Sequence, residues 1–369
     1  MSGWSRRGVL AGASFLPLAA ASGGDAQGAE DAITLLLQQN RYSLEDDGFA
    51  FLLAEAGHAA YFLLGELHGD NEIPALLHRL WPELWARTYR HMAAELSPWR
   101  AARMASGQET PSRSLWSLEE ARFIASFAPD ALCGCDMEEF RPDLMVEELS
   151  RRNPASPALA AMAGRGHYTR ADASDMREAF SRIGEIADVN AGGISLREQI
   201  RATLDVETIR ALRSTKPQTA YQASQRREAV MKTFFTAHFR GSDFKVMARF
   251  GRNHMHRGID RRGIATLGNF IAEYAAGKGQ TCFNLACFAT GGEVHIDQNT
   301  IAWDERGDDP VFAYLAGLND EGSAGIFDLR PLRPLLHTQP ASSPLLAGLR
   351  YWADSYDAVL HYPRVTPRP

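Results

Sequence analysis

The chain has 369 residues, of which 45% are hydrophobic, enough for one large domain or two modest ones around a proper core. Its 39 Lys and Arg and 45 Asp and Glu residues give a formal net charge of -6 and form no basic tract. Nucleic-acid binding depends on clustered cations, so nucleic acid is a poor candidate partner. We expect a small-molecule substrate instead. Four cysteines are too few for a disulfide scaffold.

The first 29 residues have the pattern of a twin-arginine signal peptide. Arg6 and Arg7 precede an apolar stretch rich in Ala and Gly, which leads to a region of small residues suited to cleavage. Pro17 interrupts this stretch, which is shorter than the roughly 20 residues of a bilayer-spanning helix. We therefore expect a periplasmic or secreted protein with no stable membrane anchor after signal removal, and one α/β domain over residues 30–369.

Apolar runs and helical periodicities alternate along the first half of the expected mature chain. We predict strands and intervening helices, in chain order, at residues 59–66, 71–88, 92–96, 118–127 and 131–137. Alternation of this kind is typical of parallel β-α units with right-handed crossovers.

Between residue 141 and about residue 238, apolar residues recur at helical spacing and no strand-like run occurs. We interpret this stretch as a helical insertion that caps the strand ends. Further strands are predicted at residues 243–250, 281–288, 325–329 and 357–362. The fold class is therefore α/β, with a central mostly parallel sheet, flanking helices and a large helical insertion. The tail from Pro363 is expected to fray.

Two motifs place a histidine just after a strand. Residues 65–68 read Gly-Glu-Leu-His, and residues 251–254 read Gly-Arg-Asn-His. Residues two apart in an extended backbone face the same side, so Glu66 and His68 are expected to point together. For this pair alone, a surface carboxylate and a helix cap would be the simpler interpretation. The second motif favours chemistry, because ligands bind at the carboxyl ends of strands in open α/β sheets.

A third apolar run ends in an acid, Glu95, so three strand ends together offer two histidines and two glutamates. The predicted catalytic residues are Glu66, His68, Glu95 and His254. Such a set suits either a divalent metal, zinc or manganese, held by these same four side chains, or a water-activating base with its orienting partner.

These motifs, in this order, resemble the superfamily that includes the erythromycin esterases, the ChaN haem-binding lipoproteins and the Tiki and TraB proteins. The likeness is carried by residues 63–72, 94–96, 134–136, 226–231, 251–254 and 357–360. In the esterases, a histidine after the first strand is the base that activates water. The resemblance assigns that role to His68 and assigns the rest of the site to Glu66, Glu95 and His254. Residues expected to contact the substrate are Glu72, Asp136, Arg227, Asn253 and His256.

One departure from the esterase pattern concerns the first motif. The esterases place two residues between the glutamate and the histidine, whereas this chain has only Leu67, as ChaN and Tiki do. The shorter spacing argues against a macrolide substrate and leaves open the use of a metal, which the Tiki branch implies.

Three functions follow from these observations. The first is a hydrolase in which His68, or a metal, activates water to cleave an ester, lactone or amide. No Gly-x-Ser-x-Gly sequence occurs, so an acyl-serine route is not expected. The second, implied by the ChaN likeness, is a haem- or metal-binding protein without catalysis. The third is a family member with a vestigial site, which four intact ionisable groups disfavour.

Overall fold

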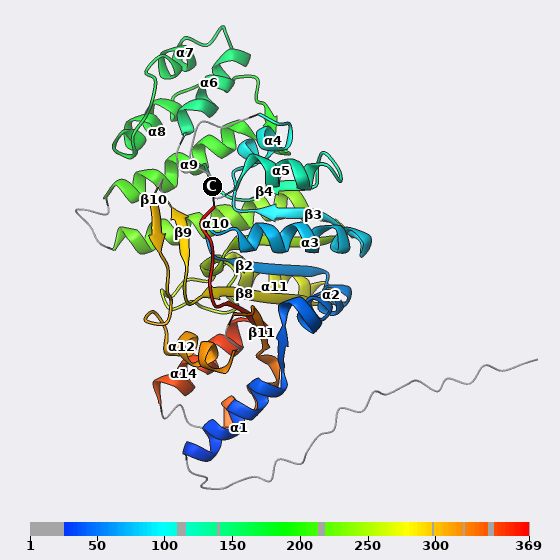
Figure 1. Cartoon of the computed structure of the whole chain (residues 1–369). Coiled ribbons are helices and arrows are strands. Elements are labelled where there is room, and N and C mark those ends of the chain that lie inside the picture. Colours follow the sequence, from blue (N-terminus) through cyan, green and yellow to red (C-terminus); the bar gives the residue numbers. More distant parts are fainter. Residues whose placement is uncertain are drawn as a thin grey trace, which may run out of the picture.

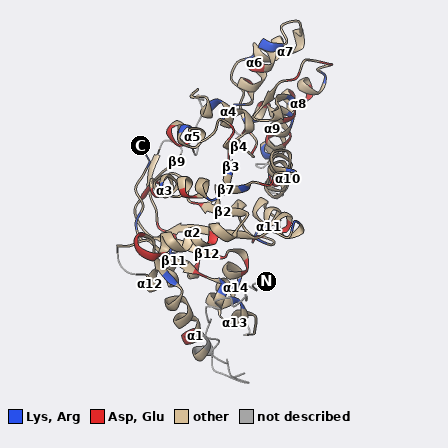
Figure 2. Cartoon of the chain, turned by 90° about the vertical axis from the view of Figure 1, so that its right-hand side faces the viewer, with Lys and Arg blue, Asp and Glu red and all other residues tan. Residues whose placement is uncertain are grey.

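The computed structural model describes residues 26–108, 116–138, 141–212, 218–296, 299–319, 322–338 and 343–368. The predicted signal peptide lies outside these ranges, apart from its last few residues. The described chain forms three layers, with an eight-stranded sheet between two layers of helices (Figure 1, Figure 2). This arrangement confirms the predicted α/β class.

The strand order in the sheet is β1-β11-β12-β8-β2-β7-β3-β4. The strands are β1 (Arg41–Ser43), β2 (Tyr61–Glu66), β3 (Tyr89–Ala94), β4 (Leu132–Gly134), β7 (Lys245–Gly251), β8 (Cys282–Ala289), β11 (Gly325–Asp328) and β12 (Ala358–Tyr362). Strands β12, β8, β2, β7, β3 and β4 run parallel, and β1 and β11 add an antiparallel edge. The carboxyl ends of the parallel strands therefore lie along one edge of the sheet.

Both faces of the sheet are buried, which explains why its strands read as continuous apolar runs. Along β2, Phe62 and Leu64 pack on one side and Leu63 on the other, and all three are fully buried. The first face is covered by α2 (Phe49–His58), α3 (Glu72–Ala86) and α5 (Leu118–Ala125), and the second by α10 (Thr219–Phe239), α11 (Leu267–Gly277) and α14 (Pro344–Ser355) (Figure 2).

The remaining helices lie around these layers. They are α1 (Ala26–Gln39), α4 (Pro98–Ala105), α12 (Pro310–Leu318) and α13 (Arg333–Thr338), with the short segments η1 (Leu44–Gly48), η4 (Arg252–His254) and η5 (Arg330–Leu332). None of the helices in the described ranges combines the length and apolarity that a membrane-spanning helix needs.

The helical insertion forms a layer of its own beyond β4 (Figure 1). It consists of α6 (Pro142–Arg152), α7 (Pro157–Ala163), η2 (Arg170–Asp172), α8 (Ala173–Ser181) and α9 (Leu196–Ala211). The four α-helices among these share a separate apolar core. The last predicted helix of the insertion, α10, instead packs Phe234 and Phe235 against the sheet. The cap is therefore shorter than predicted.

The prediction that residues 141–238 contain no strand is wrong at one place. Strands β5 (Asn190–Ala191) and β6 (Ile194–Ser195) form a small hairpin. Its two turn residues, Gly192 and Gly193, have φ of 61° and 80°, as a tight hairpin turn requires. The strands are too short to give an alternating apolar pattern.

The prediction that the tail frays is also wrong. Val365 is buried, its amide donates to the carbonyl of Gly291, and its own carbonyl accepts from Glu293 at the start of β9 (Glu293–Ile296). Strand β9 forms a second hairpin with β10 (Asn299–Ala302). Backbone hydrogen bonds therefore fix the segment after β12.

Helix α1 offers a matched test of this core. Leu37 is fully buried, whereas Leu35 on the same helix is 55% exposed. Leu37→Ala should lower the free energy of unfolding by about 2–5 kcal/mol, because it leaves a cavity, and Leu35→Ala should change it by less than about 0.5 kcal/mol. Urea unfolding measures both. Equal values for the two variants would show that α1 does not pack on the domain.

Candidate functional site

The predicted site residues come from three adjacent strands. Strand β7 lies between β2 and β3, and Gly251 at its end is in register with Glu66 at the end of β2. Glu95 is the first residue after β3. The short helix η4 begins directly after Gly251 and carries His254. The carboxyl ends of neighbouring parallel strands thus bring together residues that are far apart in sequence.

Glu66 is the ion-pair partner of one nitrogen of His68. Glu66 is buried, and its Oε2 accepts a hydrogen bond of 2.5 Å from Nε of Arg249. Its other oxygen, Oε1, lies 3.3 Å from Nδ1 of His68, whose side chain is 29% exposed. Because Arg249 fixes the carboxylate, the imidazole is oriented with Nδ1 toward Glu66 and Nε2 away from it.

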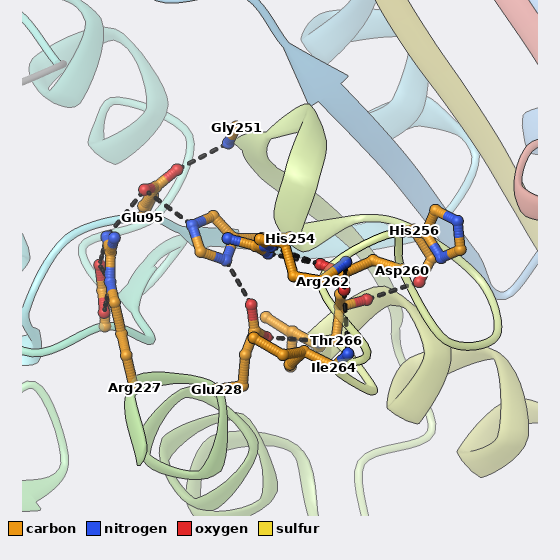
Figure 3. Close-up of polar contacts among 12 residues, drawn as sticks. Glu95, Arg227, Glu228, Gly251, His254, His256, Asp260, Arg262, Ile264 and Thr266 are labelled. Atoms are coloured by element: carbon orange, nitrogen blue, oxygen red, sulfur yellow. Dashed lines mark hydrogen bonds and ion pairs between the residues drawn. The ribbon is translucent and has the colours of Figure 1, made fainter. Parts of the chain in front are cut away.

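Glu95 lies between the two histidines. Its Oε2 accepts a 2.6 Å hydrogen bond from the amide of Gly251 and lies 3.8 Å from Nε2 of His68. Its Oε1 accepts from Nη2 of Arg227 at 2.8 Å and lies 3.5 Å from Nε2 of His254 (Figure 3). Both imidazoles therefore turn Nε2 toward one carboxylate.

His254 has a carboxylate partner that sequence reasoning missed. Its Nδ1 lies 2.6 Å from Oε1 of Glu228 (Figure 3). The other oxygen of Glu228 accepts a hydrogen bond from the amide of Leu267 at 2.7 Å. Glu228 is buried on α10. The sequence offered one indication of its role, because Glu228 follows Arg227 in the stretch 226–231, where charged residues precede apolar ones.

Arg227 joins the site to a fourth strand end, that of β4. Its Nε donates to Oδ1 and Oδ2 of Asp136 at 3.1 and 3.2 Å, its Nη2 also contacts Oδ2, and the same Nη2 reaches Glu95. Asp136 lies just beyond β4 and is buried. Two of the five expected substrate contacts, Arg227 and Asp136, are thus at the site.

The structure does not bring Glu72, Asn253 and His256 to this set. Glu72, at the start of α3, accepts hydrogen bonds from the amide and hydroxyl of Thr366 in the C-terminal segment. The turn of η4 makes the side chains of residues 254 and 256 diverge (Figure 3). His256 is buried, with its Nε2 2.6 Å from Oγ of Ser355.

Asn253 and His256 instead line a separate cavity of about 190 Å³. Its other walls include the rings of Tyr351 and Tyr356. Glu72, Asn253 and His256 therefore lie apart from the contacts of the four predicted catalytic residues, and their contact with a substrate stays a prediction.

Arg249 is a second residue that sequence reasoning missed. It is fully buried in β7, where its Nη1 donates to Oε1 of Glu120 at 2.6 Å and its guanidinium lies 4.1 Å from the ring centroid of Trp116. The signal was a single arginine flanked by the apolar residues Ala248 and Phe250 inside the strand. A charge buried in this way requires carboxylate partners.

The network shifts the pKa of each predicted catalytic residue. Burial lowers the pKa of His68, but the carboxylates of Glu66 and Glu95 outweigh it, so the pKa is raised above its usual range. The pKa of His254 is raised in the same way, since Glu228 and Glu95 oppose the effect of burial.

The two predicted catalytic glutamates shift in the opposite direction. Burial raises the pKa of each carboxyl, but Arg249 lowers that of Glu66, and His254 and Arg227 lower that of Glu95, so both lie below their usual range. The glutamates therefore stay ionised and favour protonated imidazoles.

The donor set does not fit the predicted divalent metal. Across the ranges that the structure describes, no group of three or more His, Cys, Asp or Glu side chains is arranged to hold a metal ion. Both oxygens of Glu95 already accept hydrogen bonds, and the guanidinium of Arg227 beside them repels a cation. The haem alternative stays a prediction.

The raised pKa of His254 makes a prediction about stability. Protonation of His254 adds to the free energy of unfolding. The whole contribution is present below the unfolded-state pKa of about 6.5, and it is lost as the pH rises through the higher folded-state pKa. Between about pH 6 and pH 9, the free energy of unfolding of the wild type should therefore fall relative to that of His254→Gln. Urea unfolding of both proteins at the two pH values measures this difference. A constant difference between the two proteins would contradict the ion pairs of His254.

No protein-family model matches the sequence, and no curated protein matches it significantly. Among solved structures, a succinoglycan biosynthesis protein matches with a TM-score of 0.62 and 14% identity, over 93% of this chain and 99% of that one. A Bacillus cereus protein matches with a TM-score of 0.59 and 13% identity, over 91% and 98% of the two chains. A mutant of the erythromycin esterase EreC in its open conformation matches with a TM-score of 0.53 and 13% identity, over 91% and 97%. The chain therefore shares its fold with these three proteins, one of which is named an erythromycin esterase.

Proposed function

We propose that the protein is a hydrolase that cleaves an ester, lactone or amide with a water molecule activated by His68. One observation carries the proposal: Arg249 fixes the carboxylate of Glu66, whose Oε1 lies 3.3 Å from Nδ1 of His68, while Nε2 lies 3.8 Å from Glu95, too far for a hydrogen bond. An imidazole oriented through one nitrogen, with the other available for a proton, is the arrangement of a general base. EreC, which has this fold, is named an erythromycin esterase, and this supports hydrolysis of an ester-type bond.

The first step uses neutral His68. With Nδ1–H directed at Glu66, Nε2 carries the lone pair and accepts a proton from water while the water oxygen attacks the carbonyl carbon. Glu66 and Glu95 stabilise the imidazolium that forms, as they do when they raise the pKa of His68. The carbonyl oxygen becomes the negative oxygen of a tetrahedral intermediate.

His254 is suited to the second step. Its Nδ1 lies 2.6 Å from Glu228, closer than the 3.3 Å between His68 and Glu66, so its protonated form is more strongly stabilised. When the intermediate breaks down, the bond from the carbonyl carbon to the leaving oxygen or nitrogen breaks, and Nε2 of His254 gives that atom a proton. Solvent then returns the proton from His68 to His254.

The substrate would approach the strand ends beside the helical insertion. Helices α9 and α10 pack together, and α10 carries both Arg227 and Glu228. A cap joined to the residues of the site in this way is placed to select the substrate. We propose that the insertion shapes the pocket for a small molecule.

We also propose that the protein is exported by the twin-arginine route to the periplasm or beyond. The sequence pattern of residues 1–29 supports this, and α1, which packs on the domain, begins at the end of that stretch. The twin-arginine route carries proteins that are already folded. A first helix that packs on the domain at the end of the signal peptide is compatible with export in the folded state.

The roles of the two histidines can be tested with ethyl acetate, an ester whose ethoxide leaving group must gain a proton. His68→Ala and His254→Ala should each lower kcat by at least about 100-fold, because each removes a proton-transfer group. The melting temperatures should stay close to that of the wild type. His58→Ala, at an exposed position, is the control and should keep the wild-type rate. Undiminished rates in both site variants would end the proposal.

Gly251 offers a second test that leaves every ionisable group in place. A Cβ at this position would lie 2.6 Å from Nε2 of His68 and 3.3 Å from Oε2 of Glu95, so Gly251→Ala must displace the imidazole. We expect kcat to fall by about 10- to 100-fold in a folded protein. The matched control is Gly57→Ala, where a Cβ meets nothing within 4 Å. If both alanine variants hydrolyse the ester at the wild-type rate, the position of His68 does not matter.

A further inference from the structure

The C-terminal segment, residues 363–368, is tied to the loop that carries His68 (Figure 1). The amide of Arg368 donates to the carbonyl of Gly69 at 3.0 Å, and the amide of Asn71 donates to the carbonyl of Thr366 at 3.0 Å. Gly69 directly follows His68. The backbone of Arg368, the last described residue, is thus fixed beside the site by hydrogen bonds that do not involve its side chain.

The side chain of Arg368 is directed at Glu120 on α5. Its Nη1 lies 3.1 Å from Oε2 of Glu120, and its Nη2 lies 3.4 Å from Oε1. The carboxylate of Glu120 is buried, with 3% of its side chain exposed, and its Oε1 also accepts from Arg249 at 2.6 Å. Two guanidinium groups therefore share one buried carboxylate.

The same Arg249 also holds Glu66. The contacts run in sequence from Arg368 to Glu120, from Glu120 to Arg249, from Arg249 to Glu66, and from Glu66 to Nδ1 of His68. Without Arg368, Glu66 and Glu120 would compete for one guanidinium, and a buried carboxylate would be left partly uncompensated. Arg249 would then move toward Glu120 and away from Glu66.

We propose that Arg368 is a positioning residue of the site, which keeps Arg249 on Glu66, and thereby Glu66 on His68, by neutralising Glu120. The inference rests on the proposed role of His68 as the base. It gives the C-terminal segment a part in the reaction, although Arg368 itself touches neither His68 nor a reacting atom.

The test compares Arg368→Ala, Arg368→Lys and Arg364→Ala in the full chain, with p-nitrophenyl acetate as the probe. Arg368→Ala should lower kcat by about tenfold and change KM by less than about twofold, because it disturbs the base rather than the binding of the ester. Arg368→Lys should recover part of kcat, since it keeps the charge but loses the two-pronged contact. Arg364→Ala removes an exposed charge from the same segment and should match the wild type.

A second measurement separates this inference from the proposed function. The imidazole NMR signals of His68, identified by their absence in His68→Ala, should shift in Arg368→Ala at constant pH and stay in place in Arg364→Ala. If the wild type does not hydrolyse the ester, the proposed function fails, and the NMR shift alone then decides the positioning role.

Two outcomes would overturn the inference. The first is an Arg368→Ala variant with the His68 signals of the wild type, whatever its rate. The second is an Arg368→Lys variant that is as slow as Arg368→Ala although its His68 signals stay in place, as they do in Arg364→Ala. A melting curve at the assay pH confirms that each variant is folded when it is measured.

Discussion

The buried guanidinium of Arg249 is the constraint on which the rest of the site depends. It lies in the middle of the sheet with no exposed surface, so β7 can take its place only if carboxylates neutralise it. Glu66 on β2 and Glu120 on α5 do so, and Trp116 covers the guanidinium. The charge balance of the core thereby fixes the carboxylate that orients His68.

The two histidine–glutamate pairs differ in ways that suit different tasks. His68 is the more exposed imidazole and has the longer contact to its carboxylate, whereas His254 is 13% exposed and bonded closely to Glu228. Glu95 lies between them, held by Arg227 and the amide of Gly251. Pairs of titratable groups with unequal surroundings are how enzymes separate a base from an acid at one pH.

The sequence predicts the sheet and the meeting of four site residues because apolar runs mark parallel strands, whose carboxyl ends must lie together. It does not reveal Glu228, whose partner depends on how α10 packs, or Arg249, whose burial is a property of the assembled sheet. The anchoring of the C-terminal segment could not be predicted from the sequence for the same reason. Glu72 was expected at the site because it belongs to the stretch 63–72 that carries the family resemblance, but it is the first residue of α3 and binds Thr366 instead.

The most direct test of the account is the pH dependence of kcat/KM in the wild-type protein for an alkyl ester such as ethyl acetate, whose leaving group needs a proton. The account predicts a bell-shaped profile. The rate rises as His68 loses its proton, at a pH above the usual histidine value of about 6.5, and falls at higher pH as His254 loses its own. A rate that does not change between about pH 5 and pH 9, or one that changes only near pH 4, where carboxyl groups titrate, would contradict it.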